Sequence, residues 1–313
     1  MAYNSLIDRT GVASLIPIEY SKELLNMVTT EGSVVMRLAR RLRNMARYQE
    51  TLPVISALPT AYFVNGETGL KQTTEVSWED KSIYAAEVAA IIPIPESVLD
   101  DADLDIWAEV RPLIGEALGL VIDNAVLYGT NAPSTWPTAI VTAAASASNT
   151  VALGTGADLY EDTLGEDGTI ALLEADGYMA TGHVAHLTMR GKLRGLRDAD
   201  GGLLFTASPQ AANSYMLDGV GIEFPLNGAA SSSYPLISGQ WNQLVYAMRQ
   251  DITWKILTEA VIQDGSGNIV YNLAQQDMIA LRVVMRLGFQ LPNPINRINT
   301  SSTTRYPFVV LTG

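Results

Sequence analysis

Histidine and cysteine, which are common at catalytic and metal centres, are nearly missing from this 313-residue sequence. Cysteine is absent, so thiol nucleophiles, disulfide bonds and thiolate zinc sites are excluded. The two histidines, His183 and His186, are three residues apart, and in a strand that spacing places them on opposite faces. We therefore interpret both as structural and expect neither a metal ion nor a cofactor.

Motifs that bind phosphate or calcium occur only as fragments. Gly154 and Gly156 could begin a dinucleotide-binding loop, but Leu159 occupies the position of the third glycine, and no P-loop or G-x-S-x-G motif is present. Asp264–Asn268 resembles the start of an EF-hand loop, yet Ile269 stands where that loop requires glycine. The sequence predicts a protein that is not an enzyme; a soluble hydrolase with scattered carboxylates is the alternative from another functional class.

The charged side chains are unevenly distributed. The net charge is −13, and residues 100–200 hold 16 acidic and 5 basic side chains. Five arginines nevertheless fall within eleven residues. A basic cluster on an acidic protein could contact the phosphates of a polyanion, without reading sequence and with strong salt dependence, or it could line a contact between subunits. A solvated helix face is the simpler alternative. The five residues are Arg37, Arg40, Arg41, Arg43 and Arg47.

The first hundred residues predict an arm, a helix and a projecting hairpin. Residues 1–30 have too little apolar surface to form a core, and residues 31–47 show helical spacing with the arginines on the polar side. Residues 48–93 are rich in β-branched and aromatic residues around a turn at Asn65-Gly66. The middle of this hairpin is too polar for a core, and a two-stranded ribbon is marginal alone in water. We expect a neighbouring subunit to cover it.

The remaining residues predict a mixed α+β fold. A long helix is expected over residues 104–128, with Asp103 as its N-cap and termination at Gly129. Pro112 should either kink this helix or move its start to a later residue. No apolar run approaches the roughly 20 residues of a membrane span. The other expected elements are a loop at 130–150, helices at 158–175 and 192–196, strands at 182–189 and within 215–262, a hairpin tip at 264–268, and a terminal sheet from 278–291 and 306–311.

Five segments, in this order, resemble the tailed-phage major capsid proteins. Residues 94–101 (IPESVLDD) resemble the entry to the family's spine helix, and residues 123–129 (DNAVLYG) resemble its exit. Residues 190–202, 239–241 and 277–288 resemble later family segments. Together they cover most of residues 30–295, and their order and spacing carry the resemblance.

The resemblance implies a Hong Kong 97-type capsid fold, which encapsulins share. By this resemblance, the arm would be residues 1–29, the peripheral-domain helix 30–49 and the extended hairpin loop 50–93. The peripheral domain with its spine helix would be residues 94–135, the axial domain 136–254, and the return sheet of the peripheral domain 255–313. One departure is at residues 134–140, which lack the glycine of the family's turn after the spine helix.

The same resemblance implies a function and partners. Copies of the chain would form pentamers and hexamers in an icosahedral shell that encloses double-stranded DNA, held by non-specific contact. A separate scaffolding protein, a portal and decoration proteins are further implied partners, with assembly in the host cytoplasm, a place in the virion and no membrane. An encapsulin-type cargo shell is the alternative. Some relatives join subunits through Lys–Asn bonds, and Lys71 near the hairpin tip is the candidate here, although no matching asparagine or glutamate is identified.

Overall fold

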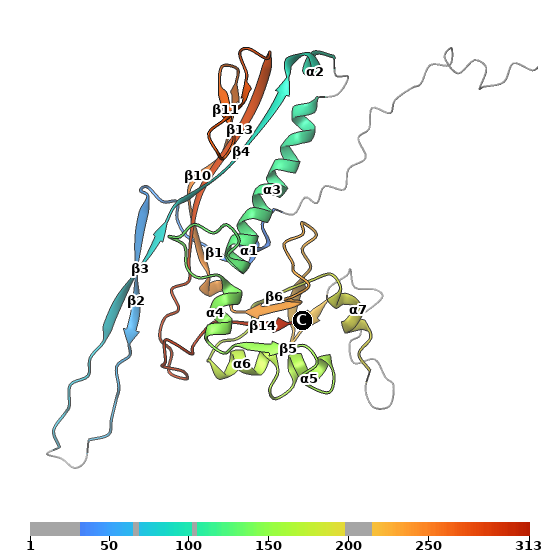
Figure 1. The fold of residues 1–313 in the computed structure, drawn as a ribbon. Coiled ribbons are helices and arrows are strands. Elements are labelled where there is room, and N and C mark those ends of the chain that lie inside the picture. Colours follow the sequence, from blue (N-terminus) through green and yellow to red (C-terminus); the bar gives the residue numbers. More distant parts are fainter. Residues whose placement is uncertain (1–31, 65–68, 102–104, 198–214) are drawn as a thin grey trace, which may run out of the picture.

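The computed structural model describes residues 32–64, 69–101, 105–197 and 215–313. Two sheets organise this part of the chain, and a separate two-stranded hairpin projects from them (Figure 1). None of its helices is long and apolar enough to cross a membrane. The mixture of helices and sheets agrees with the predicted α+β class.

A four-stranded sheet carries the long helix. Its order is β1-β10-β13-β4, with β10 and β13 antiparallel and β13 and β4 antiparallel. Along β13, Leu281 and Val283 are buried and Arg282 between them is exposed, because successive side chains of a strand point to opposite faces. The buried face packs against helix α3. The bounds are β1 Arg40–Arg41, β4 Ala86–Pro95, β10 Val245–Leu257, β13 Met278–Gln290 and α3 Ile106–Tyr128.

Helix α3 begins and ends on recognisable signals. Asp105 is the N-cap and accepts hydrogen bonds from the backbone of Trp107 and Ala108, while the predicted N-cap, Asp103, lies outside the described residues. Gly129 ends the helix with a φ of 76°, as predicted. A start of the helix beyond Pro112 is wrong, since the helix begins at Ile106 and continues through the proline. An interior proline costs about 3 kcal/mol, and burial of apolar side chains such as Ile114 against the sheet, at about 1.5–3 kcal/mol each, offsets it.

A six-stranded sheet lies at the lower end of α3 (Figure 1). Its order is β5-β14-β9-β6-β8-β7, and one apolar core joins it to α3 and the four-stranded sheet through Trp241, Phe289 and Phe308. Its strands are β5 Thr150–Ala152, β6 Gly182–Ala185, β7 Met216–Leu217, β8 Val220–Glu223, β9 Leu236–Gly239 and β14 Phe308–Thr312. The helices around it are α4 Ile140–Ser146, α5 Leu159–Leu164, α6 Thr169–Ala175 and α7 Met189–Arg194.

The remaining elements are short or project outward. Strands β2 and β3 form the hairpin that leaves the body, and β11 and β12 form a small hairpin at the far end of the four-stranded sheet (Figure 1). The bounds are α1 Val34–Leu38, β2 Gln49–Ala57, β3 Ser77–Tyr84, α2 Glu96–Asp101, the 3-10 turn Trp241–Gln243, β11 Val261–Gln263 and β12 Ile269–Asn272.

Several predicted boundaries are wrong for local reasons. The helix expected over 31–47 stops at Leu38, because Ala39 is extended and the next residues pair with β10 as strand β1. The helix expected over 158–175 is two helices, since Gly165 and Gly168 bring the chain too close to residues 161–163 for side chains to fit. The alanine-rich part of the expected loop 130–150 is helix α4, in keeping with the helix propensity of alanine.

The two C-terminal strands lie in different sheets, so the prediction of one terminal sheet is wrong. Strand β13 pairs with β10 and β4, whereas β14 pairs with β5 and β9 in the six-stranded sheet. The chain between them, residues 291–307, is largely half-buried or exposed and leads from one sheet to the other. Both strands are strongly apolar, and composition alone does not specify the partner of such a strand.

Candidate assembly surfaces

The hairpin β2–β3 contacts the body along its inner part, where Ile295 donates to the carbonyl of Ile55 at 3.2 Å and Arg297 to that of Pro59 at 2.9 Å. Val54 and Ile83 are buried, and the rings of Tyr48 and Tyr84 lie 5.8 Å apart beside them. Most other side chains of the two strands are exposed or half-buried. Figure 1 shows the hairpin extending far from both sheets, as the sequence predicts.

In the outer part of this hairpin, hydrogen bonds join its two arms. The Tyr62 hydroxyl donates to the carbonyl of Gln72 at 2.7 Å, and the amide of Thr60 donates to the Thr74 hydroxyl at 2.9 Å. These bonds join the two arms of the hairpin between Ala57 and Ser77, where neither arm forms a regular strand. The two arms therefore stay linked beyond the ends of β2 and β3.

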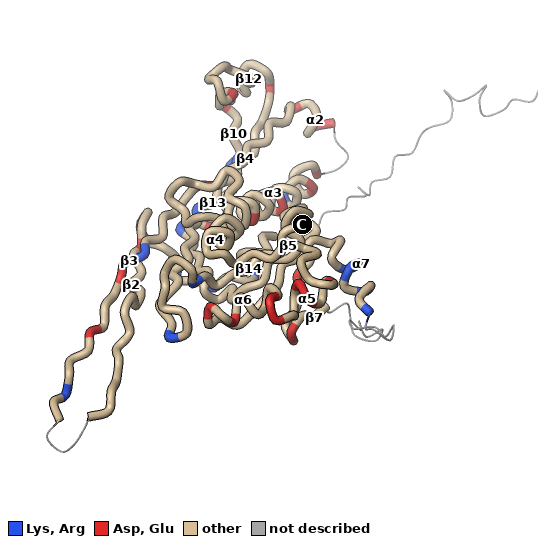
Figure 2. The backbone as a smooth tube through the Cα atoms, turned by 60° about the horizontal axis from the view of Figure 1, so that its bottom comes forward, with Lys and Arg blue, Asp and Glu red and all other residues tan. Residues whose placement is uncertain are grey.

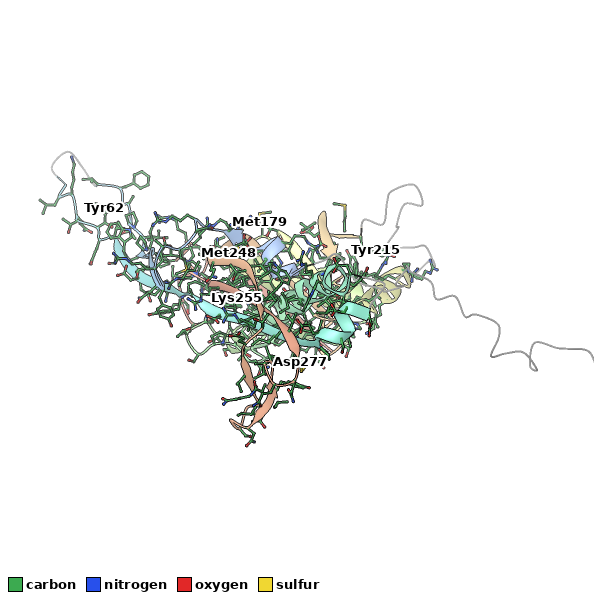
Figure 3. The ribbon with its side chains drawn as sticks, turned by 90° about the horizontal axis from the view of Figure 1, so that it is seen from above. Tyr62, Met179, Tyr215, Met248, Lys255 and Asp277 are labelled. Atoms are coloured by element: carbon green, nitrogen blue, oxygen red, sulfur yellow. The ribbon has the colours of Figure 1, made fainter. Side chains whose placement is uncertain are left out.

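Large apolar side chains on the hairpin are left in water. Phe63 is 104% exposed, Leu70 90% and Trp78 65%. Figure 3 shows the segment around Tyr62 standing clear of the body, with its side chains pointing away from it. Lys71, the residue proposed for cross-linking, is also exposed, beside Leu70. Exposed apolar surface of this kind marks a site of contact with another molecule.

The five arginines do not share one helical face. Arg37 lies on α1, Arg40 and Arg41 form strand β1, and Arg43 and Arg47 lie in the segment that leads to β2; all five are exposed. Parallel pairing of β1 with Val245 and Tyr246 fixes Arg40 and Arg41 on the edge of the four-stranded sheet. A helix, a strand and the segment before β2 therefore position the five arginines, and the cluster stays a prediction.

Two members of the cluster are neutralised within the chain. Arg37 contacts Glu223 at 2.8 Å, and Arg43 contacts Glu50 at 2.8 Å. Arg41 donates to the side chain of Asn44 at 3.1 Å. Arg43 and Arg47 also line an open depression of about 370 Å³. The guanidinium groups of Arg40, Arg41 and Arg47 have no carboxylate partner in the part of the chain that the structure describes, so they carry the cluster's uncompensated charge.

A buried carboxylate on α3 anchors the segment that carries these arginines. Asp123 is fully buried and accepts hydrogen bonds from the backbone of Val34 and Val35, each at 3.0 Å, from the Ser33 hydroxyl at 2.5 Å and from the Asn227 amide at 3.1 Å. Burial raises the pKa of Asp123, and the four hydrogen bonds oppose that shift. The carboxylate thus holds the start of α1 against α3.

One turn before Asp123, a glycine of α3 lets the residues just before α1 lie close to the helix. A side chain at Gly119 would meet Gly32 and Ser33 at less than 3 Å. Sequence reasoning did not identify this contact. The available signal was an aspartate, four residues after a glycine, on the apolar side of a predicted helix.

The histidines have structural roles in the folded chain. His183 is fully buried in β6; its Nε2 donates to the carbonyl of Leu217 at 3.2 Å, and its Nδ1 accepts from the Ser238 hydroxyl at 2.9 Å. Burial lowers the pKa of His183 to about 4, so the ring is neutral at physiological pH. His186 lies beyond the end of β6 and contacts Thr188 at 2.8 Å. The structure does not bring the two rings together.

Comparisons with known proteins agree on one family. A family model described as the phage capsid family matches residues 13–298. The major capsid protein of Staphylococcus phage 80alpha is 26% identical over 280 residues, which cover 87% of this chain and 80% of that protein. A solved chain from Microbacterium phage Oxtober96 is 32% identical with a TM-score of 0.85, covering 98% of this chain and 99% of that one. One from Mycobacterium phage Adephagia is 31% identical with a TM-score of 0.82, covering 98% of each chain. The chain belongs to the phage capsid family.

Proposed function

We propose that this chain is the major capsid protein of a phage, and that many copies assemble into a closed icosahedral shell around double-stranded DNA. The supporting family match spans residues 13–298. The observation that carries the mechanism is the projecting hairpin, whose apolar side chains Phe63, Leu70 and Trp78 remain in water in a single molecule. A second copy that covers them would remove this surface from water.

The physical consequence is a subunit whose stable state is the assembly. Burying one large apolar side chain contributes about 1.5–3 kcal/mol, and obligate interfaces bury more than about 2,000 Å². A hairpin that reaches over a neighbour adds contact area without enlarging the body of the subunit. Identical copies related by rotation then repeat the same contact, and a closed shell leaves no hairpin uncovered.

Within this proposal the parts take the roles of a Hong Kong 97-type subunit. The hairpin would be the extended loop, α3 the spine helix, the four-stranded sheet the peripheral domain and the six-stranded sheet the axial domain. Strand β14 would then belong to the axial domain, so residues 308–312 would leave the peripheral return sheet to which the sequence prediction assigned them. Scaffolding, portal and decoration proteins and packaged DNA remain proposed partners, with assembly in the host cytoplasm and a final place in the virion.

Electron microscopy of negatively stained protein, together with sedimentation velocity, tests the proposal. The protein is produced alone and with the scaffolding protein of its own virus. The full chain should form capsomers or shells, whereas a variant in which residues 58–76 are replaced by Asn-Gly should fold but stay dispersed. A full chain that remains a single compact subunit under both conditions would reject the proposal.

A further inference from the structure

The six-stranded sheet has an acidic surface at one edge. Strand β5 is the edge strand, and α5 is fixed beside it, because the Asp162 carboxylate accepts hydrogen bonds from the amides of Gly154 at 2.6 Å and Gly156 at 2.7 Å. Exposed carboxylates cover α5, α6 and the turn between them, and the sequence has no lysine or arginine between Arg111 and Arg190. We call this surface the acidic edge; it comprises Asp158, Glu161, Glu166, Asp167 and Glu174.

The opposite edge of the same sheet is basic. Helix α7 lies against β7 and β8, and the guanidinium carbon of Arg190 sits 4.6 Å from the ring centre of Tyr215 and 5.6 Å from that of Phe224. Met189 and Leu193 of α7 are buried. The cations on its other side are exposed, and we call this surface the basic edge; it comprises Lys192, Arg194 and Arg197.

One molecule cannot bring these two edges together. Strands β14, β9, β6 and β8 separate β5 from β7, while α5 and α7 pack through Leu159, Met189 and Leu193 onto one apolar cluster of the same sheet. Figure 2 shows acidic residues on α5 and α6 and basic residues on α7, at separate places on the domain. Within the described ranges, neither edge takes part in an ion pair between side chains.

We propose that the basic edge of one copy docks onto the acidic edge of the next copy within a capsomer ring. The inference rests on the proposed function and specifies which surfaces meet. Each copy offers one edge of each sign, so the contact is head-to-tail, and a head-to-tail contact closes into a ring when its rotation fits. The acid-to-base pairing also excludes the two like-signed pairings, which repel.

Apolar side chains at both edges fit the same contact. Tyr160 on α5 is 40% exposed, and Leu187 and Met216 are about half exposed beside α7 and on β7. Protein interfaces bury such side chains at their centre and keep charged groups at the rim. Two exposed edges with complementary charge and apolar residues therefore fit a second copy of this chain.

Charge reversal at each edge tests the proposal. The basic-edge variant is Lys192→Glu, Arg194→Glu and Arg197→Glu, and the acidic-edge variant is Glu166→Lys, Asp167→Lys and Glu174→Lys. The sixfold variant combines them and keeps the net charge of the natural chain. All six positions are exposed, so thermal unfolding of the dispersed subunits should be unchanged. Assembly is measured by sedimentation and electron microscopy at low and at 0.5 M salt.

The proposal predicts a specific pattern of assembly. Each triple variant should yield at least tenfold fewer capsomers at low salt, and the sixfold variant should recover most of the natural yield. An equal mixture of the two triple variants should form rings of six but not of five, because alternating copies need an even number. If the triple variants assemble like the natural chain, or the sixfold variant fails to recover, the contact is wrong. If the natural chain does not assemble, the proposed function is what fails.

Discussion

At the scale of single residues, the buried histidine makes stability depend on pH. His183 is neutral in the folded chain because burial lowers its pKa to about 4, whereas the unfolded chain binds a proton near pH 6.5. The stability that this group contributes is complete above pH 6.5 and is lost as the pH falls towards 4. From pH 7 to pH 5 the free energy of unfolding should fall by about 2 kcal/mol through this group alone.

The measurement compares two histidine variants by denaturant unfolding of the dispersed subunit at pH 7 and pH 5. His183→Gln should remove this part of the pH dependence, and the control His186→Gln, at a half-buried position beyond the end of β6, should leave it unchanged. Equal pH dependence in the His183→Gln variant and the natural chain would show that the ring takes up a proton without cost.

The carboxylate of Asp123 should be essential for holding the start of α1 against α3. Asp123→Ala leaves the backbone donors of Val34 and Val35 buried without an acceptor, and each such donor costs about 1–3 kcal/mol. We expect the free energy of unfolding to drop by at least about 2 kcal/mol and proteases to cut near residues 32–38. The matched control is Asp100→Ala on α2, which is exposed and should change stability by less than about 0.5 kcal/mol. Equal effects of the two changes would contradict the anchoring role.

At the scale of elements, the hairpin should matter for assembly and not for folding. Phe63→Ser with Leu70→Ser removes two side chains that contact water in the single subunit, so its thermal unfolding should not change. Assembly should fall at least tenfold, because the contact would lose about 3–6 kcal/mol of apolar burial. The control, Gln72→Ser with Thr73→Ser, changes two exposed polar residues of the same segment. A double-serine variant that assembles like the control would show that a neighbour does not cover the tip.

Elements with local signals could be predicted from the sequence, whereas their partners could not. The end of α3 at Gly129 and the hairpin around residues 264–268 follow from glycine and turn chemistry, which act within a few residues. The pairing of β14 with β9, in a different sheet from β13, and the pairing of β1 with β10 depend on contacts between residues far apart in the chain. Periodicity shows that a strand is buried, but it does not show which strand lies beside it.

The candidate surfaces divide in the same way. The hairpin and the arginine cluster were visible in the sequence, since the first is a β-branched and aromatic stretch around a polar turn and the second is a run of arginines. Asp123 was not found, because a single acid in a helix is a frequent surface residue and its burial arises from the return of residues 32–35 to α3. The acidic and basic edges of the six-stranded sheet are likewise a property of strand order.

At the scale of the whole molecule, charge sets which surfaces can approach DNA. The chain carries −13 overall, so most of its surface repels a polyanion. The arginine cluster at residues 37–47 is an exception near the junction of the two sheets. If this face lines the interior of the shell, it should bind phosphates without regard to sequence, and the ion pairs of Arg37 and Arg43 leave Arg40, Arg41 and Arg47 to do so.

The salt dependence of DNA binding measures this directly. Each phosphate contact contributes a slope of about −0.9 to the change of log affinity with log salt, so Arg40→Gln, Arg41→Gln and Arg47→Gln together should reduce that slope by roughly 2–3. A matched control removes three ion-paired cations, by Arg37→Gln, Lys81→Gln and Arg286→Gln, and should change it less, because those charges already have partners. If the first variant keeps the slope and loses assembly, the cluster lines a subunit contact; if both stay unchanged, the cluster is only a solvated surface and neither role stands.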